Sequence, residues 1–377
     1  MQLNQIELTN YRNYNQLTLN FSPKLNVFVG DNAQGKTNLL ESIYVLSLTK
    51  SHRSNHEKEL IQWNQEFARI EGQISKKNGD IDLTMIVSNK GKKTKVNGLE
   101  QIKLSQYIGY LNVILFAPED LSLVKGSPQH RRKFLDMEIG QINSHYLYHL
   151  SNYQTVLKQR NQYLKKTAFN KSYDSLYLEV LNEQLAQEGS FVLFSRLYFV
   201  NLLEKWANSI HENISYGKEE LRISYKSSIQ LGSAQTQEEL YYLLMKEFKK
   251  HEERDLSQFT TSVGPHRDDL IFMVNGQNVQ TYGSQGQQRT TALSVKLAEI
   301  ELINEEIGEY PVLLLDDVLS ELDDERQVQL MEFIDNKLQT FLTTTSIVHL
   351  NDKLKINPEI FYVTNGKVER TSEDVDG

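Results

Sequence analysis

The apolar and polar positions at the start of the chain predict a β-hairpin, a buried strand and a helix, in that order. Residues 1–21 alternate between apolar and polar around a polar bend at 10–15, as a half-buried hairpin does. Residues 25–29 form a short apolar run typical of a buried strand, and residues 36–48 carry apolar side chains at helical spacing. A glycine-rich segment separates these last two elements, so the chain predicts strand, loop and helix.

The next part of the chain predicts an antiparallel β patch. Segments 67–74, 81–87 and 92–96 have strand-like composition, and the turn-forming pairs Asn78-Gly79 and Asn97-Gly98 lie beside them. Asn-Gly pairs favour the tight turns that connect antiparallel neighbours, so these strands are expected to pair in sequence order.

The middle of the chain predicts helices. No proline occurs between Pro128 and Pro265, and residues 129–216 are rich in helix formers with helical periodicity. An apolar stripe in this stretch breaks at Arg160; its members are Tyr146, Leu150, Tyr153, Leu157 and Leu164. A stripe this short does not sustain a long coiled coil, so ordinary core packing in a bundle of two or three helices is expected.

After residue 265 the pattern returns to alternating strands and helices. The expected elements are a hairpin around 275–276, a helix over 286–306, a strand over 312–315, a helix over 324–337 and a strand over 340–344. We therefore expect the first and last thirds of the chain to share one sheet. The predicted organisation is a discontinuous head domain, residues 1–128 and 265–377, interrupted by a mainly helical insertion lobe, residues 129–264. The polar end, 372–377, is expected to fray.

Composition narrows the class of protein. The 377 residues are 39% hydrophobic and 24% charged, which is typical of soluble globular chains. No segment approaches the roughly 18 to 20 apolar residues that cross a bilayer, and the first residues lack a signal-peptide pattern, so a cytoplasmic protein without a membrane partner is expected. The absence of cysteine excludes disulfides and thiolate chemistry, so any metal must bind oxygen or imidazole.

The strongest chemical signal follows the first buried strand. The segment GDNAQGKT fits the pattern G-x-x-x-x-G-K-[ST] and lies between a predicted strand and a predicted helix, which is the context of a phosphate-binding P-loop. Its glycines let the backbone approach phosphates, and the helix N-terminus attracts their charge. In a P-loop, the lysine reaches the β- and γ-phosphates and the threonine hydroxyl ligates Mg²⁺. The predicted ATP-binding residues are Gly30, Asp31, Asn32, Ala33, Gln34, Gly35, Lys36 and Thr37.

The second signal is the apolar strand 312–315, which ends in Asp316 and Asp317. Such a pair after a buried strand is typical of a Walker B element: Asp316 is expected to hold Mg²⁺ directly or through water, and Asp317 is expected to orient or deprotonate the attacking water. An acidic helix cap is the alternative interpretation of an apolar strand that ends in carboxylates. The P-loop upstream favours the Walker B interpretation, with Lys36 and Asp317 as the catalytic residues.

The third signal is a polar, glycine-bearing segment that leads into the helix 286–306. We call residues Ser284–Gln288 the Ser284 loop. The Ser284 hydroxyl and the backbone N–H groups of Gln285 and Gly286 are expected to form a second phosphate-binding helix start, with Gln287 beside them. One nucleotide does not need two such sites within one chain, so we expect the P-loop of one subunit and the Ser284 loop of another to bind the same γ-phosphate. A simple capped helix start is the alternative.

These signals belong to a wider set of motifs that spans essentially the whole chain, and the set resembles the RecF family within the SMC-like branch of ABC-type ATPases. The matching segments are Asn10–Tyr14, the P-loop, Lys50–Ser54, Phe116–Asp120, His130–Asp136, Gly264–Asp269, the Ser284 loop and Leu315–Asp323. The resemblance implies an α/β fold: a P-loop ATPase head of the ABC/SMC type, with a mixed sheet, flanking helices, an antiparallel β patch and an inserted helical lobe.

The resemblance also implies an activity. Proteins of this family are ATP-dependent DNA-binding dimers that bind double-stranded, single-stranded and gapped DNA and are weak, DNA-stimulated ATPases. They act with RecR and RecO in recombinase loading, replication recovery and SOS induction. By this resemblance the Ser284 loop is the signature loop. Asp317 stands where transporters usually carry glutamate, and Thr343–Thr345 stands where a switch histidine is common, which suggests slow hydrolysis as a timing switch.

A DNA partner requires a local basic surface, because the formal net charge of the chain is −8. The candidate phosphate contacts are Lys50, Arg53, Lys92, Lys93, Arg131 and Arg132. A solvated charged face is the alternative for each cluster, and Arg131 and Arg132 are alternatively expected to pair with Asp136 and Glu138. The main alternative function is an ATPase switch whose partner is a protein bound through the helical lobe. A transporter ATPase is disfavoured by the opening hairpin and the missing histidine.

Overall fold

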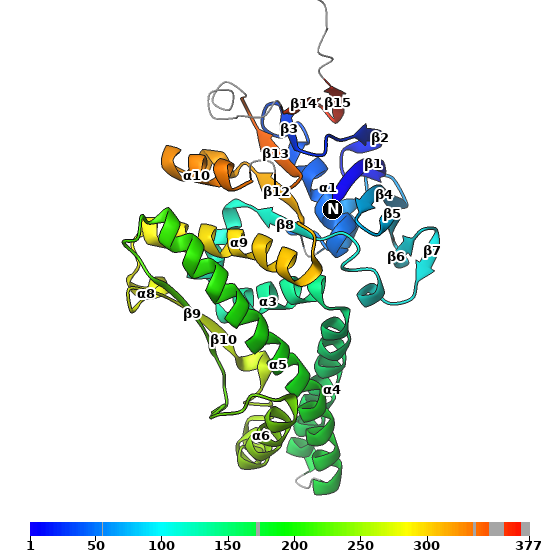
Figure 1. Cartoon of the computed structure of the whole chain (residues 1–377). Coiled ribbons are helices and arrows are strands. Elements are labelled where there is room, and N and C mark those ends of the chain that lie inside the picture. Colours follow the sequence, from blue (N-terminus) through cyan, green and yellow to red (C-terminus); the bar gives the residue numbers. More distant parts are fainter. Residues whose placement is uncertain (55, 171–173, 335–336, 347–357, 371–377) are drawn as a thin grey trace, which may run out of the picture. The chain divides into compact units, whose positions relative to one another are not determined.

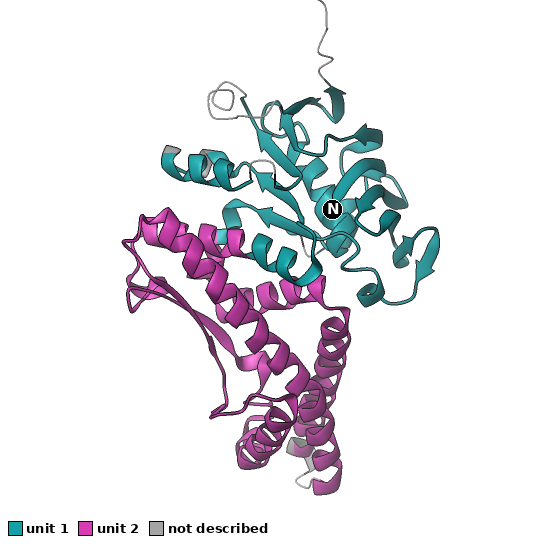
Figure 2. Cartoon of the chain, viewed as in Figure 1, with its two compact units in different colours: residues 1–120, 299–377 teal, residues 121–298 magenta. Residues whose placement is uncertain are grey.

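The computed structural model describes residues 1–54, 56–170, 174–334, 337–346 and 358–370 (Figure 1). The chain forms two compact units (Figure 2). Unit 1 contains Met1–Asp120 and Glu299–Gly377, and unit 2 contains Leu121–Ala298. The predicted frayed end, 372–377, lies outside the described residues. No described helix is long and apolar enough to cross a membrane.

The core of unit 1 is a six-stranded sheet in the order β15-β14-β3-β13-β12-β8, in which only the edge strand β15 is antiparallel to its neighbour. Its strands are β3 (Leu25–Val29), β8 (Val113–Phe116), β12 (Val312–Asp316), β13 (Thr340–Thr344), β14 (Glu359–Thr364) and β15 (Lys367–Arg370). Every residue of β3, β8 and β12 is buried, as expected for continuous apolar runs in a parallel sheet. The shared sheet expected for the first and last thirds of the chain is confirmed, because Leu25 of β3 lies opposite Thr340 of β13.

Helix α1 (Lys36–Leu48) has the predicted bounds and is buried on almost every side. It contacts β12 and β13 of the parallel sheet and also β4 and β5 of a second sheet. Its buried residues include the polar Glu41, Ser42 and Ser47, and each of these finds a hydrogen-bond partner inside the protein, as buried polar groups require. Helix α10 (Asp324–Ile334) forms over most of its predicted range, and residues 335–336 lie outside the described part of the chain.

The second sheet of unit 1 is antiparallel, with the order β2-β1-β4-β5-β6-β7. Its strands are β1 (Gln2–Tyr11), β2 (Tyr14–Asn20), β4 (Phe67–Lys76), β5 (Gly79–Ser88), β6 (Gly91–Val96) and β7 (Leu99–Gln101). The opening hairpin and the β patch, predicted as separate features, form one sheet because β1 pairs with β4, with Leu8 opposite Ile70. Both side chains are buried, so the alternation seen in the sequence has its apolar face on the core.

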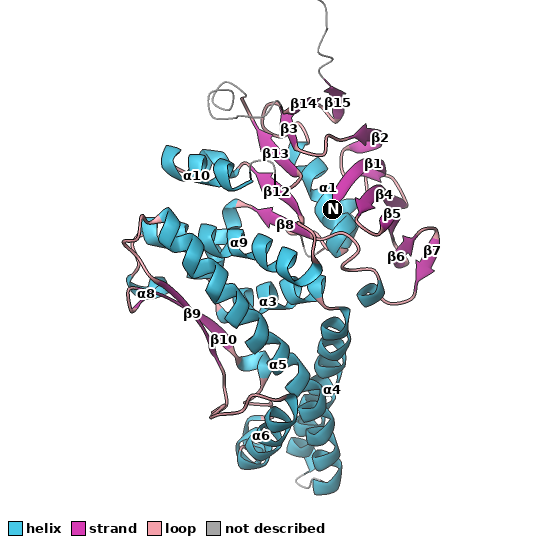
Figure 3. Ribbon diagram, viewed as in Figure 1, coloured by secondary structure: helices cyan, strands magenta, loops and turns pink. Residues whose placement is uncertain are grey.

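Unit 2 is mainly helical (Figure 3). Its helices are α2 (Leu121–Lys125), α3 (Pro128–Ile142), α4 (Ser144–Asn170), α5 (Ser175–Ile214), α6 (Gln237–Lys250), α7 (Glu252–Gln258), α8 (Val279–Tyr282) and the first part of α9 (Gln285–Ile307). The unit also contains a three-stranded sheet, β11-β10-β9, formed by β9 (Leu221–Lys226), β10 (Asp269–Val274) and β11 (Gln277–Asn278).

The boundaries of the compact units differ from the predicted 128/129 and 264/265. They lie at 120/121 and 298/299, so residues 265–298 group with unit 2. Strand pairing explains the difference: β10 pairs with β9, with Leu270 opposite Tyr225, and with neither sheet of unit 1. The second boundary falls inside the continuous helix α9.

Candidate nucleotide-binding site

The P-loop connects β3 to α1, and its two glycines occupy positions that exclude a side chain. A Cβ atom on Gly30 would lie 2.3 Å from the carbonyl oxygen of Val363 in the neighbouring strand. Gly35 has a φ of +118°, and a Cβ atom there would lie 2.6 Å from Asn13 Nδ2 and 2.8 Å from the Tyr14 hydroxyl. The motif glycines are therefore required by backbone conformation and close approach.

Two neighbouring turns hold the P-loop in place. From the β1–β2 turn, the Tyr14 hydroxyl donates to the Gly35 carbonyl over 3.0 Å. From the β14–β15 turn, Asn365 N donates to Gln34 Oε1 over 2.7 Å, and Gly366 N donates to the Gln34 carbonyl over 3.1 Å. Both ends of unit 1's sequence thus support one loop, which sequence spacing did not predict.

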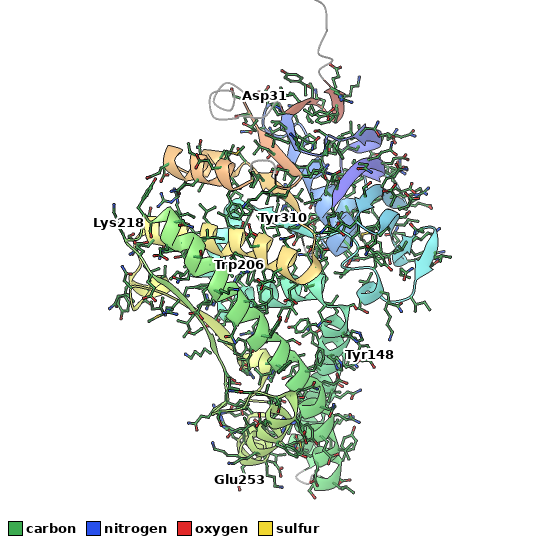
Figure 4. The ribbon with its side chains drawn as sticks, in the orientation of Figure 1. Asp31, Tyr148, Trp206, Lys218, Glu253 and Tyr310 are labelled. Atoms are coloured by element: carbon green, nitrogen blue, oxygen red, sulfur yellow. The ribbon has the colours of Figure 1, made fainter. Side chains whose placement is uncertain are left out.

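Lys36 is buried and folded back over the loop. Its Nζ donates to the carbonyl oxygens of Gly30 (2.6 Å) and Asp31 (2.8 Å); Asp31 is marked in Figure 4. Burial lowers the pKa of Lys36, while the charges of Asp317, Asp31 and Asp316 oppose that shift. The loop backbone therefore fixes the position of the ammonium group close to three carboxylates.

The P-loop threonine meets the first carboxylate after β12. Thr37 Oγ1 donates to Asp316 Oδ1 over 3.0 Å, and Thr343 Oγ1 donates to the same oxygen over 2.9 Å. Asp316 and Thr343 are register partners in the parallel strands β12 and β13, so their side chains share one end of the sheet. Ligands of open α/β sheets bind outside this end of the strands.

Asp317, the next residue, has an unusual backbone conformation. Its φ is +53° and ψ is +21°, and its N–H donates to Thr343 Oγ1 over 2.9 Å. Ala33 in the P-loop also has a positive φ, +64°. Non-glycine residues with positive φ are uncommon and cluster at functional sites. Thr343 therefore contacts both members of the carboxylate pair.

A cavity of about 460 Å³ opens over these groups in unit 1. This volume lies in the range of small-molecule sites. Sequence analysis missed Asn38 as a lining residue and assigned Arg53 to DNA alone, whereas Thr343 and Thr345 belong to the segment that stands at the switch position. Arg53 donates to Asn38 Oδ1 over 2.9 Å. The lining residues are Asn32, Ala33, Gly35, Lys36, Thr37, Asn38, Arg53, Asp317, Thr343 and Thr345.

The donor set fits a magnesium nucleotide. Hydroxyl and carboxylate oxygens are the ligands that Mg²⁺ prefers. Thr37 Oγ1 and Asp316 Oδ1 supply one oxygen of each kind, 3.0 Å apart. The start of α1 carries no side-chain cap at Gly35, so its backbone N–H groups suit phosphate oxygens. Thr37 and Asp316 are the residues that would hold the metal.

The Ser284 loop begins α9 in unit 2 and has the geometry of a capping box. Gln287 N donates to Ser284 Oγ over 3.2 Å, and Ser284 N donates to Gln287 Oε1 over 3.0 Å. The capped helix start considered from the sequence is therefore present. Ser284, Gln285 and Gly286 are exposed to solvent, so capping leaves this surface accessible.

Two of the cations predicted to contact DNA are instead buried and paired with carboxylates of the same chain. Arg131 is buried: Nε and Nη2 donate to the two carboxylate oxygens of Asp269 over 2.6 and 3.0 Å, and Nη1 donates to Gly126 O over 2.7 Å. The partners expected for it, Asp136 and Glu138, do not hold it. Lys92 is 8% exposed, donates to Thr49 O over 2.6 Å and pairs with Glu57. These side chains stabilise the fold and are not retained as DNA contacts.

The remaining basic candidates are more accessible. Lys50 is exposed, and the Lys93 side chain is 63% exposed, with Nζ 3.4 Å from Glu100 Oε1. Arg132 donates to the Asp268 carbonyl over 2.8 Å, and burial, followed by the charge of Arg196, lowers its pKa. Lys50 and Lys93 in unit 1 are therefore the best-placed cations of the original set.

The parallel sheet, the P-loop and the carboxylate pair after β12 define an ATPase head of the ABC/SMC type. The chain matches the family described as RecF/RecN/SMC N terminal domain over residues 2–369. It belongs to this family and, within it, to the RecF proteins.

Individual relatives agree over nearly the whole chain. It is 60% identical to the DNA replication and repair protein RecF of Enterococcus faecalis, over 99% of this chain and 100% of the relative. Two solved structures of the recombination mediator protein RecF in the RecFOR pathway, described as RecF-ATPrS and RecF-ATP, have TM-scores of 0.91 and 0.90. Each is 33% identical and covers 98% of both chains.

Proposed function

We propose that this protein is an ATP-gated, DNA-binding dimer of recombinational repair. The observation that carries the proposal is the contact between Thr37 and Asp316, which joins the P-loop to the carboxylate pair beside a nucleotide-sized cavity. Relatives named as DNA replication and repair proteins, and structures described as RecF-ATP, support ATP and DNA as the two ligands. A protein acting on the chromosome in this way would work in the cytoplasm.

The residues in and beside the cavity would have different roles in ATP binding and hydrolysis. Lys36 and the N–H groups at the start of α1 would bind the phosphates, and Thr37 and Asp316 would hold Mg²⁺, which neutralises phosphate charge when it is bound. Asp317 would orient the attacking water and accept its proton. An aspartate is one methylene shorter than glutamate, which supports a weak, DNA-stimulated ATPase that acts as a timing switch.

ATP would close the dimer. The exposed Ser284, Gln285 and Gly286 would complete the site on a second protomer by binding the γ-phosphate held at its P-loop. DNA would then bind the joint basic surface formed by the dimer. The energetic relation is linkage: ATP strengthens DNA binding only as far as both ligands favour the same dimer. RecR and RecO are the proposed partners in recombinase loading, replication recovery and SOS induction.

Fluorescence anisotropy of a labelled duplex, with and without an adjoining single-stranded gap, tests this function. The protein is titrated with ATP-Mg²⁺, with ADP-Mg²⁺ and without nucleotide, at two salt concentrations. We expect tight binding only with ATP, weakening as salt rises, because released counterions drive phosphate binding. Lys36→Met should abolish ATP binding and ATP-stimulated dimerisation together; a variant that dimerises normally with ATP would exclude the shared-site arrangement.

A charge reversal locates the DNA surface. Lys93→Glu changes an exposed cation of unit 1, and Lys249→Glu on α6 is the matched control because its side chain is 80% exposed. Only Lys93→Glu should weaken DNA binding while leaving ATP affinity unchanged. Equal effects of the two variants would show that net charge alone matters. Reversal at Arg131 is not informative, since it breaks a buried ion pair.

The second candidate is an ATPase switch that acts mainly on a protein partner through the helical unit. Its supporting observation is a set of exposed apolar side chains in the first two turns of α5: Leu176 (69%), Tyr177 (49%) and Val180 (41%). Such patches mark protein interfaces. Equal or absent DNA binding in every nucleotide state would favour this candidate.

A further inference from the structure

A chain of side-chain contacts connects the Ser284 loop to the end of α5, within unit 2. Gln287 Nε2 donates to Glu219 Oε1 over 2.9 Å. The other carboxylate oxygen, Glu219 Oε2, lies 3.1 Å from His211 Nε2, and His211 Nδ1 lies 3.0 Å from Ser294 Oγ on α9. The path therefore leaves α9 at Gln287 and returns to the same helix at Ser294.

The backbone places these groups together. His211 is in the last turn of α5, and the helix is followed by Tyr216 and Gly217 with φ of +54° and +73°, which turn the chain towards β9. Figure 4 labels Lys218, the residue before Glu219, at this turn. Gln287 and Ser294 are seven residues apart, two helical turns, so they present side chains on the same face of α9.

The side chains of His211 and Glu219 differ in burial. The His211 side chain is 0% exposed, whereas that of Glu219 is 22% exposed. Burial lowers the pKa of His211, which favours the neutral ring, although Glu219 opposes this shift. A neutral ring that carries its proton on Nε2 donates to Glu219. The Ser294 hydroxyl, which also lies 2.8 Å from the Thr290 carbonyl, can then donate to His211 Nδ1 instead of to that carbonyl. The carboxylate is then held with Oε1 directed at Gln287.

We propose that Glu219, oriented by His211, is a positioning residue that holds the Ser284 loop in the shape that receives the γ-phosphate of a second protomer. The Gln287 side-chain amide makes two hydrogen bonds at once. Its Oε1 accepts from Ser284 N, and its Nε2 donates to Glu219. Without Glu219 the Gln287 amide is free to rotate, and the hydrogen bond from Ser284 N to Gln287 Oε1 is then lost. This inference rests on the proposed function, because it assigns a role to a loop that the ATP-bound dimer uses.

The test uses the full-length protein with Glu219→Ala, and Glu220→Ala as the matched control. Glu220 is the adjacent residue; its side chain is 55% exposed and contacts Arg222. The substitution Glu220→Ala removes the same charge as Glu219→Ala. ATP affinity is measured with a fluorescent ATP analogue, and ATP-dependent dimerisation is measured by mass photometry. A charge-assisted hydrogen bond is lost at both sites of a two-fold dimer, so we expect dimerisation of Glu219→Ala to weaken by at least about tenfold, with ATP affinity unchanged.

A conservative variant separates hydrogen bonding from charge. In Glu219→Gln the amide oxygen still accepts from Gln287, and the other tautomer of His211 accepts from the new NH₂ group, so dimerisation should stay within about twofold of wild type. Hydrogen exchange at the amides of 284–288, measured without nucleotide, should rise in Glu219→Ala but not in Glu220→Ala. This second measurement reports on the loop whether or not a dimer forms.

The outcomes distinguish the two proposals. If wild type fails to dimerise with ATP, the proposed function fails and this inference fails with it. If wild type dimerises and Glu219→Ala dimerises equally well, or if the loop amides exchange no faster, the positioning role is overturned while the proposed function stands. Stronger dimerisation of both Glu219→Ala and Glu219→Gln would also overturn it, because that result would show a simple repulsion between this carboxylate and phosphate.

Discussion

Thr37 Oγ1 donates a hydrogen bond to Asp316 Oδ1 over 3.0 Å, across 279 residues of sequence. The contact exists because β3 and β12 are both next to β13 in one parallel sheet, so that the helix after β3 begins beside the end of β12. The two oxygens most suited to a divalent cation are therefore brought together by the fold before any ligand binds.

Asp316→Asn tests the role of that carboxylate. The amide oxygen can still accept from Thr37, but the negative charge that attracts Mg²⁺ is gone. ATP affinity in the presence of Mg²⁺ should fall at least about tenfold, which corresponds to about 1.4 kcal/mol, whereas affinity in EDTA should not fall. Isothermal titration under both conditions measures this. Asp82→Asn, an exposed carboxylate on β5, is the control. Equal losses with and without Mg²⁺ would mean that the P-loop itself is damaged.

Substitution of Arg160 is expected to lower the stability of unit 2 strongly. Its side chain is fully buried, with Nη1 2.8 Å from Asp255 Oδ2 and Nε 2.7 Å from Asn182 Oδ1. Arg160→Met leaves the Asp255 charge buried and unpaired, so unfolding in urea should become easier by roughly 3 to 5 kcal/mol. Adding Asp255→Asn removes that charge and should restore part of the loss. Two variants with additive losses would contradict the ion-pair explanation.

The buried His266 is expected to make the stability of the folded protein depend on pH. Its Nδ1 lies 2.7 Å from the Tyr153 hydroxyl and its Nε2 lies 3.1 Å from Thr261 O, which one neutral tautomer satisfies. Burial lowers the pKa of His266 from 6.5 to about 4. The unfolded chain takes up a proton below about pH 6.5 and the folded chain only below about pH 4, so stability falls as pH drops through this window, by up to roughly 3 kcal/mol.

The variant His266→Gln can make both hydrogen bonds but does not titrate. Its melting temperature should therefore fall less steeply than that of wild type between pH 6.5 and pH 4. His145→Gln, an exposed histidine on α4, should follow the wild-type curve. A wild-type slope in His266→Gln would show that other groups cause the acid sensitivity.

Local sequence patterns predicted the elements around the nucleotide site well, because the P-loop, α1 and β12 are each encoded by contiguous residues. Partners from distant segments were not predictable. Arg131 looked like a surface cation, yet its partner Asp269 lies 138 residues away. The break in the α4 stripe at Arg160 carried a signal, but its partner Asp255 is 95 residues distant. Charge alone does not distinguish a buried arginine from an exposed one, since burial depends on which segments pack together.

The position of β3 also bears on how the protein is made. This strand carries the P-loop, yet its two neighbours in the sheet are β13 and β14, which begin at residues 340 and 359. A ribosome adds roughly 5 to 20 residues per second, so the P-loop strand emerges many seconds before either neighbour exists. During that interval β3 has two open edges, and the growing chain has no complete nucleotide site. A chain that ends before residue 340 therefore lacks both strands that flank the P-loop strand and the Thr343 hydroxyl that contacts Asp316, so the nucleotide site is completed only after these residues have been made.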